Sequence, residues 1–234
     1  MIVRPKPNLL GILFSLKGSI AKRIALRSLL VTLLASVIVL VETLHPAYFS
    51  KVNATPFTLL GLSLSIFMSF RNNACYDRWW EGRKQLGQMI IDVRSLIRET
   101  QVLRDPAERA GLLRSVCGFA HGLVARLRHE DEAQAIKPWS QFQANHPNLP
   151  DNLLQQVGAR FSALAEQGAI SEWRYTQWEA RLVSLSQVQA SCERIKSTPL
   201  PFPYTLLLHR TIYLFCILLP FAMAEPLGWL TPVF

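Results

Sequence analysis

The residue types that could do chemistry are scattered along this chain of 234 residues. His121 and His129 lie eight residues apart on one predicted helix, which is too far for both to bind one metal ion. The run from His129 to Glu132 contains metal-binding residue types, but at a helix end a solvated charge run explains it better. Nucleophile-elbow, phosphate-loop and dinucleotide motifs are absent from the sequence. We therefore predict no catalytic residue, no metal site and no cofactor, which favours transport or structure over an enzyme.

A second set of reactive groups is the cysteines, which form neither a CxxC pair nor a metal-binding spacing. We expect reduced thiols that pack as small hydrophobic residues. The four positions are Cys75, Cys117, Cys192 and Cys216.

More specific is an apolar line formed by Leu62, Ile66 and Phe70, which lie four residues apart and so share one face of a helix. The residues alone favour a core or lipid-facing stripe. The alternative is a pore neck, because identical helices around an axis would stack these side chains into three hydrophobic rings. Such a constriction gates by excluding water.

The run from Phe70 to Lys84 follows directly and combines three arginines and a lysine with two adjacent tryptophans. Arg and Trp suit the membrane interface, but so dense a cluster exceeds what anchoring needs. Arg78 and Glu81 are three residues apart, so we predict that they form an ion pair. We expect this cluster to hold neighbouring helices or subunits together.

Three long apolar stretches must position these residues. Ser28–Ser50 contains the single acidic residue Glu42, Val52–Phe70 contains no charged residue, and Tyr204–Ala224 contains the single cation Arg210. A helix needs about 20 mostly apolar residues to cross a bilayer. The sequence thus predicts an all-α integral membrane protein with three membrane-spanning helices.

The charge distribution predicts the orientation, since Lys and Arg accumulate on the cytoplasmic side. Residues 1–27 carry six Lys or Arg and no acidic residue, so we place this segment in the cytoplasm. Residues 28–70 then form spans one and two, with the second lining any pore, and 71–200 form a cytoplasmic helical domain. Residues 201–234 hold the third span and the start of a fourth, and we interpret the chain as a piece of a longer one.

The net charge of +9 does not indicate nucleic-acid binding, because residues 1–27 supply six of the nine excess positive charges. Residues 71–200 hold 17 Lys and Arg and 14 Asp and Glu, interspersed rather than gathered on one face. We expect no nucleic-acid partner.

Within 71–200, apolar residues recur at spacings of three and four, which predicts amphipathic helices. Asp105 and Pro106 have the types expected of an N-cap and a first helical residue. One helix is expected to run from Pro56 to about Leu103. The three apolar stripes consist of Leu112, Leu113, Val116, Phe119, Ala120, Leu123, Val124 and Leu127, then Leu153, Leu154, Val157, Phe161 and Leu164, then Trp178, Leu182, Leu185, Val188 and Cys192.

Two separated motifs resemble the bestrophin family of ion channels. The run from Phe70 to Lys84 is similar to the signature that follows the family's second span, and Ser197–Tyr204 is similar to the entry into its third. The resemblance implies identical subunits, five in a ring around one pore, with Leu62, Ile66 and Phe70 as the neck. It also implies a second, cytosolic narrowing on the helix that starts near Trp173, for which our candidate is Ala180.

The resemblance further implies that membrane lipid and small monovalent ions are partners. The ions are chloride and other anions in animal relatives and cations in some bacterial ones, and the membrane is the bacterial inner membrane. Nothing in these residues supports calcium gating, since the acidic segment that binds calcium in animal relatives would lie beyond Phe234. Two alternatives stay open, a secondary transporter and a membrane scaffold without a pore. The residues that we assign to structure and interfaces are Arg71, Arg78, Trp79, Trp80, Glu81, Pro199 and Pro201.

Overall fold

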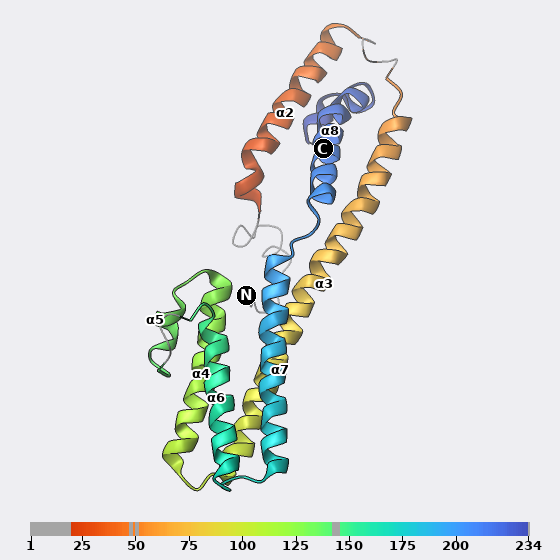
Figure 1. Cartoon of the computed structure of the whole chain (residues 1–234). Helices are drawn as coiled ribbons and strands as arrows, with labels where there is room; N and C mark the ends of the chain where they lie inside the picture. The colour runs from red at the N-terminus through yellow and green to blue at the C-terminus, as the bar shows by residue number, and fades with distance from the viewer. Residues whose placement is uncertain (1–19, 47–48, 50–51, 142–145, 234) are drawn as a thin grey trace, which may run out of the picture. The chain divides into compact units, whose positions relative to one another are not determined.

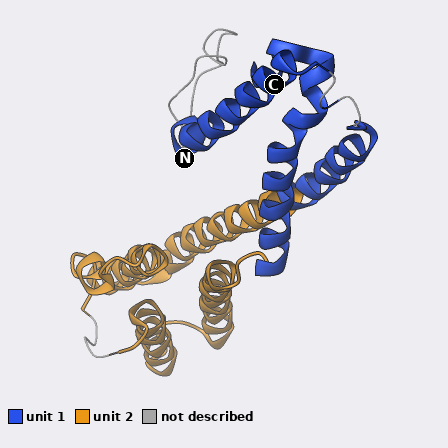
Figure 2. Ribbon diagram, turned by 90° about the horizontal axis from the view of Figure 1, so that it is seen from above, with its two compact units in different colours: residues 1–72, 201–234 blue, residues 73–200 orange. Residues whose placement is uncertain are grey.

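The computed structural model describes residues 20–46, 49, 52–141 and 146–233, and these residues form helices and their connections without a strand (Figure 1). The predicted cytoplasmic cations Arg4, Lys6 and Lys17 lie outside the described residues. The chain divides into two compact units, coloured separately in Figure 2. Unit 1 comprises Met1–Asn72 with Pro201–Phe234, and unit 2 comprises Asn73–Leu200. The all-α prediction is confirmed for the described residues.

Unit 1 contains helix α2 (Ala21–Leu44), the first part of α3 (Thr55–Glu99), α8 (Phe202–Leu227) and the 3-10 helix η2 (Gly228–Val233). Its buried core is small. Ile38 and Val39 of α2 pack with Ala224 of α8. Many large apolar side chains of α2 and α8 are exposed on this unit, and few are fully buried.

Among the residues that the structure describes, two helices are long and apolar enough to cross a membrane. These are α2, with a mean hydropathy of 2.5, and Phe202–Val233, with 1.8. In each helix, only 17% of the most apolar stretch of 18 residues is buried. Neither helix is therefore the core helix of a soluble domain. The predicted second span is the beginning of α3 and is not among the two, because threonines and serines dilute its apolar residues. Its passage through the membrane stays a prediction.

Unit 2 is a helical bundle formed by the remainder of α3, η1 (Thr100–Val102), α4 (Pro106–Arg128), α5 (Glu132–Ile136), α6 (Leu149–Glu166) and α7 (Glu172–Ser197). Side chains cap the helix starts: Asp105 accepts from the Ala107 N–H, with Pro106 in the first turn as predicted. Asn148 and Ser171 cap α6 and α7 in the same way. The predicted long helix ends at Glu99, four residues before Leu103.

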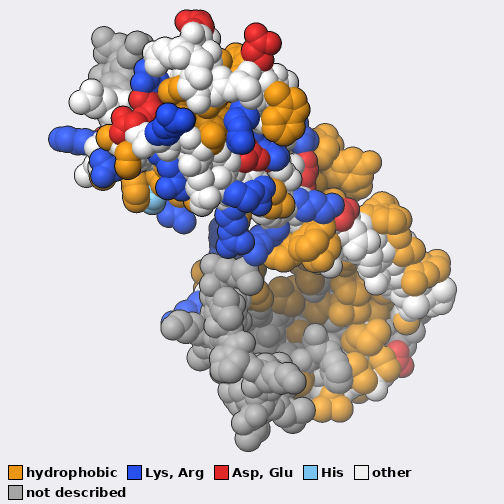
Figure 3. All heavy atoms as spheres, turned by 90° about the horizontal axis from the view of Figure 1, so that it is seen from below, with side chains coloured by type: hydrophobic (Ala, Val, Ile, Leu, Met, Phe, Trp, Pro, Cys, Tyr) orange, Lys and Arg blue, Asp and Glu red, His pale blue; other side chains and the backbone are white. Residues whose placement is uncertain are grey.

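The core of unit 2 contains nearly all of the three predicted apolar stripes. Phe119, Phe161 and Trp178 are each at most 1% exposed, and the Phe161 and Trp178 ring centroids lie 4.9 Å apart. The exceptions all belong to the α4 stripe: Val124 is 36% exposed at its edge, and Leu113 and Ala120 are half-buried. On the face drawn in Figure 3, Lys and Arg side chains lie among Asp and Glu over one part, and hydrophobic side chains predominate among the other described residues.

Candidate functional site

The apolar line predicted as a neck lies on α3, within unit 1. Leu62 is 61% exposed, Ile66 49% and Phe70 65%, so the line does not pack into the core of its own subunit. At 1.5 Å of rise per residue, the three side chains are about 6 Å apart along the helix. Leu60 and Leu64 lie on the opposite face and are half-buried. The line is therefore available to lipid, to other copies or to a pore, and its role as a neck stays a prediction.

Arg78 connects the two sequence motifs. Its guanidinium donates hydrogen bonds to the carbonyl oxygens of Thr198, at 2.8 Å, and Ile195. These carbonyls end α7, where no further helical N–H is available to them, and a cation there also suits the helix dipole. Arg78 thus fixes the end of α7, immediately before Pro199.

Glu81 forms its ion pair with Arg194 of α7. The predicted pair between Arg78 and Glu81 is therefore wrong. Spacing along one helix identified two compatible charges, but partners on α7 bind each of them instead. Both residues hold α3 to α7 within one subunit.

The other residues of the cluster remain largely on the surface of the subunit. Trp79 and Trp80 are 50% and 46% exposed, and their rings lie 6.0 Å apart. Arg71 is half-buried, whereas Pro199 and Pro201 are exposed, and Pro201 is the N-cap residue of α8. The tryptophans leave apolar surface for lipid or another subunit, and the assignment of all five to interfaces stays a prediction.

A buried carboxylate, which the sequence analysis missed, also joins α3 to α7. Asp92 has no exposed surface and accepts a hydrogen bond of 2.6 Å from the Ser184 hydroxyl. The Gln88 amide donates to both Asp92 oxygens, and Arg181 lies 3.8 Å away. Arg181 also pairs with Glu99 at 3.1 Å. The available signal was an acid among apolar neighbours, since Asp92 follows Met-Ile-Ile and precedes Val.

Ala180, the candidate for a second narrowing, is exposed on α7. Arg181 and Ser184, one and four residues further along, are held by Glu99 and Asp92 of α3. The Asp92 network therefore determines where the Ala180 face of α7 lies relative to the second half of α3. The narrowing itself stays a prediction.

The remaining candidates for chemistry have structural surroundings. His129 adopts a positive φ of 59° at the end of α4, Asp131 caps α5, and Glu132 pairs with Arg126. Burial raises the pKa of the Cys192 thiol, which keeps it protonated and unreactive. The described part of the chain contains no group of three or more His, Cys, Asp or Glu arranged for a metal ion.

An all-helical fold with two membrane-type helices and a long helix shared between two units defines the broad class of the protein. The model of the bacterial and fungal bestrophin proteins matches residues 1–234. The chain is 39% identical to the voltage-dependent anion channel-forming protein mll4386 of Mesorhizobium japonicum, over all of this chain and 77% of the relative. It is 37% identical to the voltage-dependent anion channel-forming protein YneE of Escherichia coli, over 99% of this chain and 78% of that protein.

Solved structures agree. A variant of the bacterial bestrophin homologue from Klebsiella pneumoniae matches with a TM-score of 0.83 at 30% identity, covering 90% of this chain and 81% of that one. The chain belongs to the bestrophin family, as the two motifs predicted.

Proposed function

We propose that this chain is the subunit of a bestrophin-like ion channel, in which identical copies enclose one pore in the membrane. It conducts small monovalent ions passively and catalyses no reaction. The single observation that carries the proposal is the line of Leu62, Ile66 and Phe70, which is exposed on the subunit although it is apolar. The relatives support conduction, since they are named anion channel-forming proteins.

The proposed neck contains no polar or charged side chain. The three side chains extend over roughly 12 Å of the helix axis and offer no group that replaces the hydration of an ion. An ion must therefore cross while still hydrated, and a narrow wall of this kind closes when it loses its water. Because the line carries no charge, it controls passage rather than the sign of the ion. The relatives' names make anions the first candidate.

The assembly that we propose is a ring of five copies in the bacterial inner membrane, with the N-terminus in the cytoplasm. Helices α2 and α8 face lipid, and the first part of α3 lines the pore. A helix that faces a pore and its neighbours does not need to be apolar on all sides, which accounts for the serines of α3. Arg71, Trp79, Trp80, Pro199 and Pro201 are proposed to support this arrangement, and Ala180 to form the wider cytosolic narrowing.

Conductance of the purified protein in a planar bilayer tests the proposal. We expect discrete single-channel currents, and a reversal potential in asymmetric KCl that gives the sign of the permeant ion. A secondary transporter would show substrate-coupled flux without unitary currents. A scaffold would show neither, and both results would contradict the proposal.

A further inference from the structure

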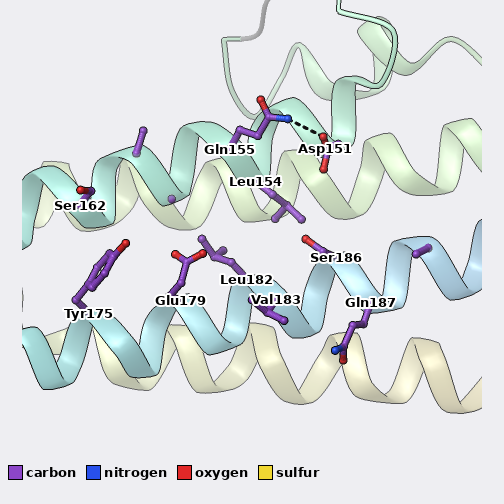
Figure 4. Close-up of a pocket in the computed structure, with 13 residues that line it drawn as sticks. Asp151, Leu154, Gln155, Ser162, Tyr175, Glu179, Leu182, Val183, Ser186 and Gln187 are labelled. Carbon is purple, nitrogen blue, oxygen red and sulfur yellow. Dashed lines mark hydrogen bonds between the residues drawn. The ribbon is translucent and has the colours of Figure 1, made fainter.

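A groove runs between α6 and α7 on the surface of unit 2, with a volume of about 740 Å³ (Figure 4). Its apolar base comes from Leu154 and Leu182, and Gly158 and Ala190 leave it open because their side chains are small. Polar side chains border it, including Asp151 and Glu179, and no Lys, Arg or His lines it. The groove is thus apolar at the base and negatively charged at its edges.

The carboxylate of Glu179 has no ion-pair partner among the residues that the structure describes, although six other ion pairs form in this unit. The Asp151 carboxylate accepts a hydrogen bond of 2.7 Å from the Gln155 amide, which is a neutral partner. Both acids therefore remain available to cations from outside the subunit.

A stripe on α3 has the complementary character. We term it the α3 stripe, and it consists of Arg83, Leu86, Ile90, Arg94 and Ile97. These residues recur at spacings of three and four and so share one face of the helix. Leu86 is 36% exposed, Ile90 49% and Ile97 42%. Arg83 and Arg94 are exposed and have no ion-pair partner in the described ranges. Such an apolar surface on a helix bundle in water marks a site of association.

The α3 stripe and the groove lie on opposite sides of the α3–α7 pair. Gln88 and Asp92 face α7, where both reach Ser184. Ile90 is two residues from each of them, which places it about 200° around α3. On α7, Ser184 faces α3, and the groove residue Ser186 is likewise two residues away.

We infer that the α6–α7 groove of one subunit receives the α3 stripe of the next copy of this chain. The inference rests on the proposed function, which requires identical subunits in a ring. A ring needs two different surfaces that fit each other head to tail, and these must lie on different sides of the subunit. The α3 stripe supplies isoleucines for the apolar base and arginines for Glu179 and Asp151.

The dimensions agree with this pairing. The stripe extends over roughly 21 Å from Arg83 to Ile97, at 1.5 Å per residue. The groove residues of α7, from Tyr175 to Ala190, extend over roughly 22 Å. One helix face therefore fills the groove along its length.

Cysteine cross-linking of the full chain tests the inference. In a Cys75→Ser background, Ile90→Cys and Val183→Cys are combined, and a short bismaleimide is added to the detergent-purified protein. Head-to-tail contact is expected to give a ladder of covalent dimers, trimers and larger species. No ladder is expected from either single-cysteine variant, because one of the two thiols is missing. No ladder is expected either from the matched pair Val124→Cys with Val183→Cys, because Val124 lies on α4 outside both surfaces.

Light scattering on the same samples separates two failures. An intact oligomer without the ladder would overturn the proposed interface and leave the channel untouched. A monomer would contradict the channel itself. A product that stops at the dimer would indicate a two-fold contact, which also overturns the inference. As a second variant, Arg94→Glu is expected to reduce the oligomer fraction, and Glu179→Arg added to it to restore part of the loss.

Discussion

The two units of this chain bury their apolar residues to very different extents. In unit 2, Phe119, Phe161 and Trp178 are enclosed by helices of the same subunit. In unit 1, side chains such as Leu29 and Leu207 remain more than half exposed although they belong to the most apolar helices.

The difference shows what each unit requires in order to be stable. Unit 2 contains enough inward-facing surface to form its own core, as a soluble bundle does. Unit 1 leaves long apolar faces that are unfavourable in water, so we expect lipid and neighbouring subunits to cover them. Apolar substitutions are therefore expected to affect folding in unit 2 and conduction or assembly in unit 1.

The largest expected effect is on the core of unit 2. Trp178→Ala should lower the free energy of unfolding by about 3–5 kcal/mol, because it removes a fully buried ring. Trp173→Ala is the matched control on the same helix, where the side chain is 70% exposed, and it should cost less than about 0.5 kcal/mol. Urea unfolding of the detergent-purified protein measures both. Equal losses would contradict the burial that separates the units.

Asp92→Ala should cost about 2–3 kcal/mol, since it leaves Ser184 and Gln88 without their buried acceptor. Asp92→Asn keeps one acceptor oxygen and should lose less. Circular dichroism during thermal unfolding measures the series. If Asp92→Ala unfolds like the unmodified chain, the network does not hold α7 to α3.

Arg78→Ala should destabilise by about 1.5–2 kcal/mol, because two carbonyls at the end of α7 lose a charged donor. Glu81→Ala should cost only about 0.2–1 kcal/mol, since its pair with Arg194 is partly exposed and screened. Reversal potentials should stay unchanged in both. A shifted ion preference in an intact oligomer would instead place these residues in the conduction path.

The smallest effect concerns pH. A hydrogen bond from Arg160 holds the pKa of Glu108 below its ordinary value. The stability from this pair is therefore fully present above the unfolded pKa of about 4.3 and is lost as pH falls through the lowered pKa. Urea titrations between neutral pH and about pH 3 should show a loss that Glu108→Gln removes. The same acid sensitivity in the Gln variant would assign it to other carboxylates.

Much of the fold could be predicted because periodicity and caps are local signals. Spacing alone identified the buried face of α6 that includes Phe161. Residue type alone identified Asp105 as the N-cap of α4. The family was also predictable, because two motifs in the right order carry it.

Partners distant in sequence could not be predicted in the same way. Spacing on one helix paired Arg78 with Glu81, whereas the partners lie 113 or more residues away on α7. Asp92 was missed for the same reason, since its partner Ser184 is 92 residues distant. The predicted second span presents a different difficulty. The serines at the beginning of α3 lower its mean hydropathy, but a helix that lines a pore can contain serines.

The central claim is that the exposed face of α3 forms the neck. Replacing Leu62, Ile66 and Phe70 together with Ala removes the apolar wall but no charge. The matched control replaces Phe57, Leu60 and Leu64 with Ala, on the opposite, half-buried face of the same helix. Both triple variants remove two aliphatic side chains and one phenylalanine.

Single-channel recording of the two triple variants is the most direct test. We predict that the neck variant forms an intact oligomer with a raised unitary conductance and a nearly unchanged reversal potential. The control should keep the original conductance in whatever fraction assembles. An unchanged current in the neck variant would contradict the account, and it would mean that these side chains face lipid or protein rather than ions.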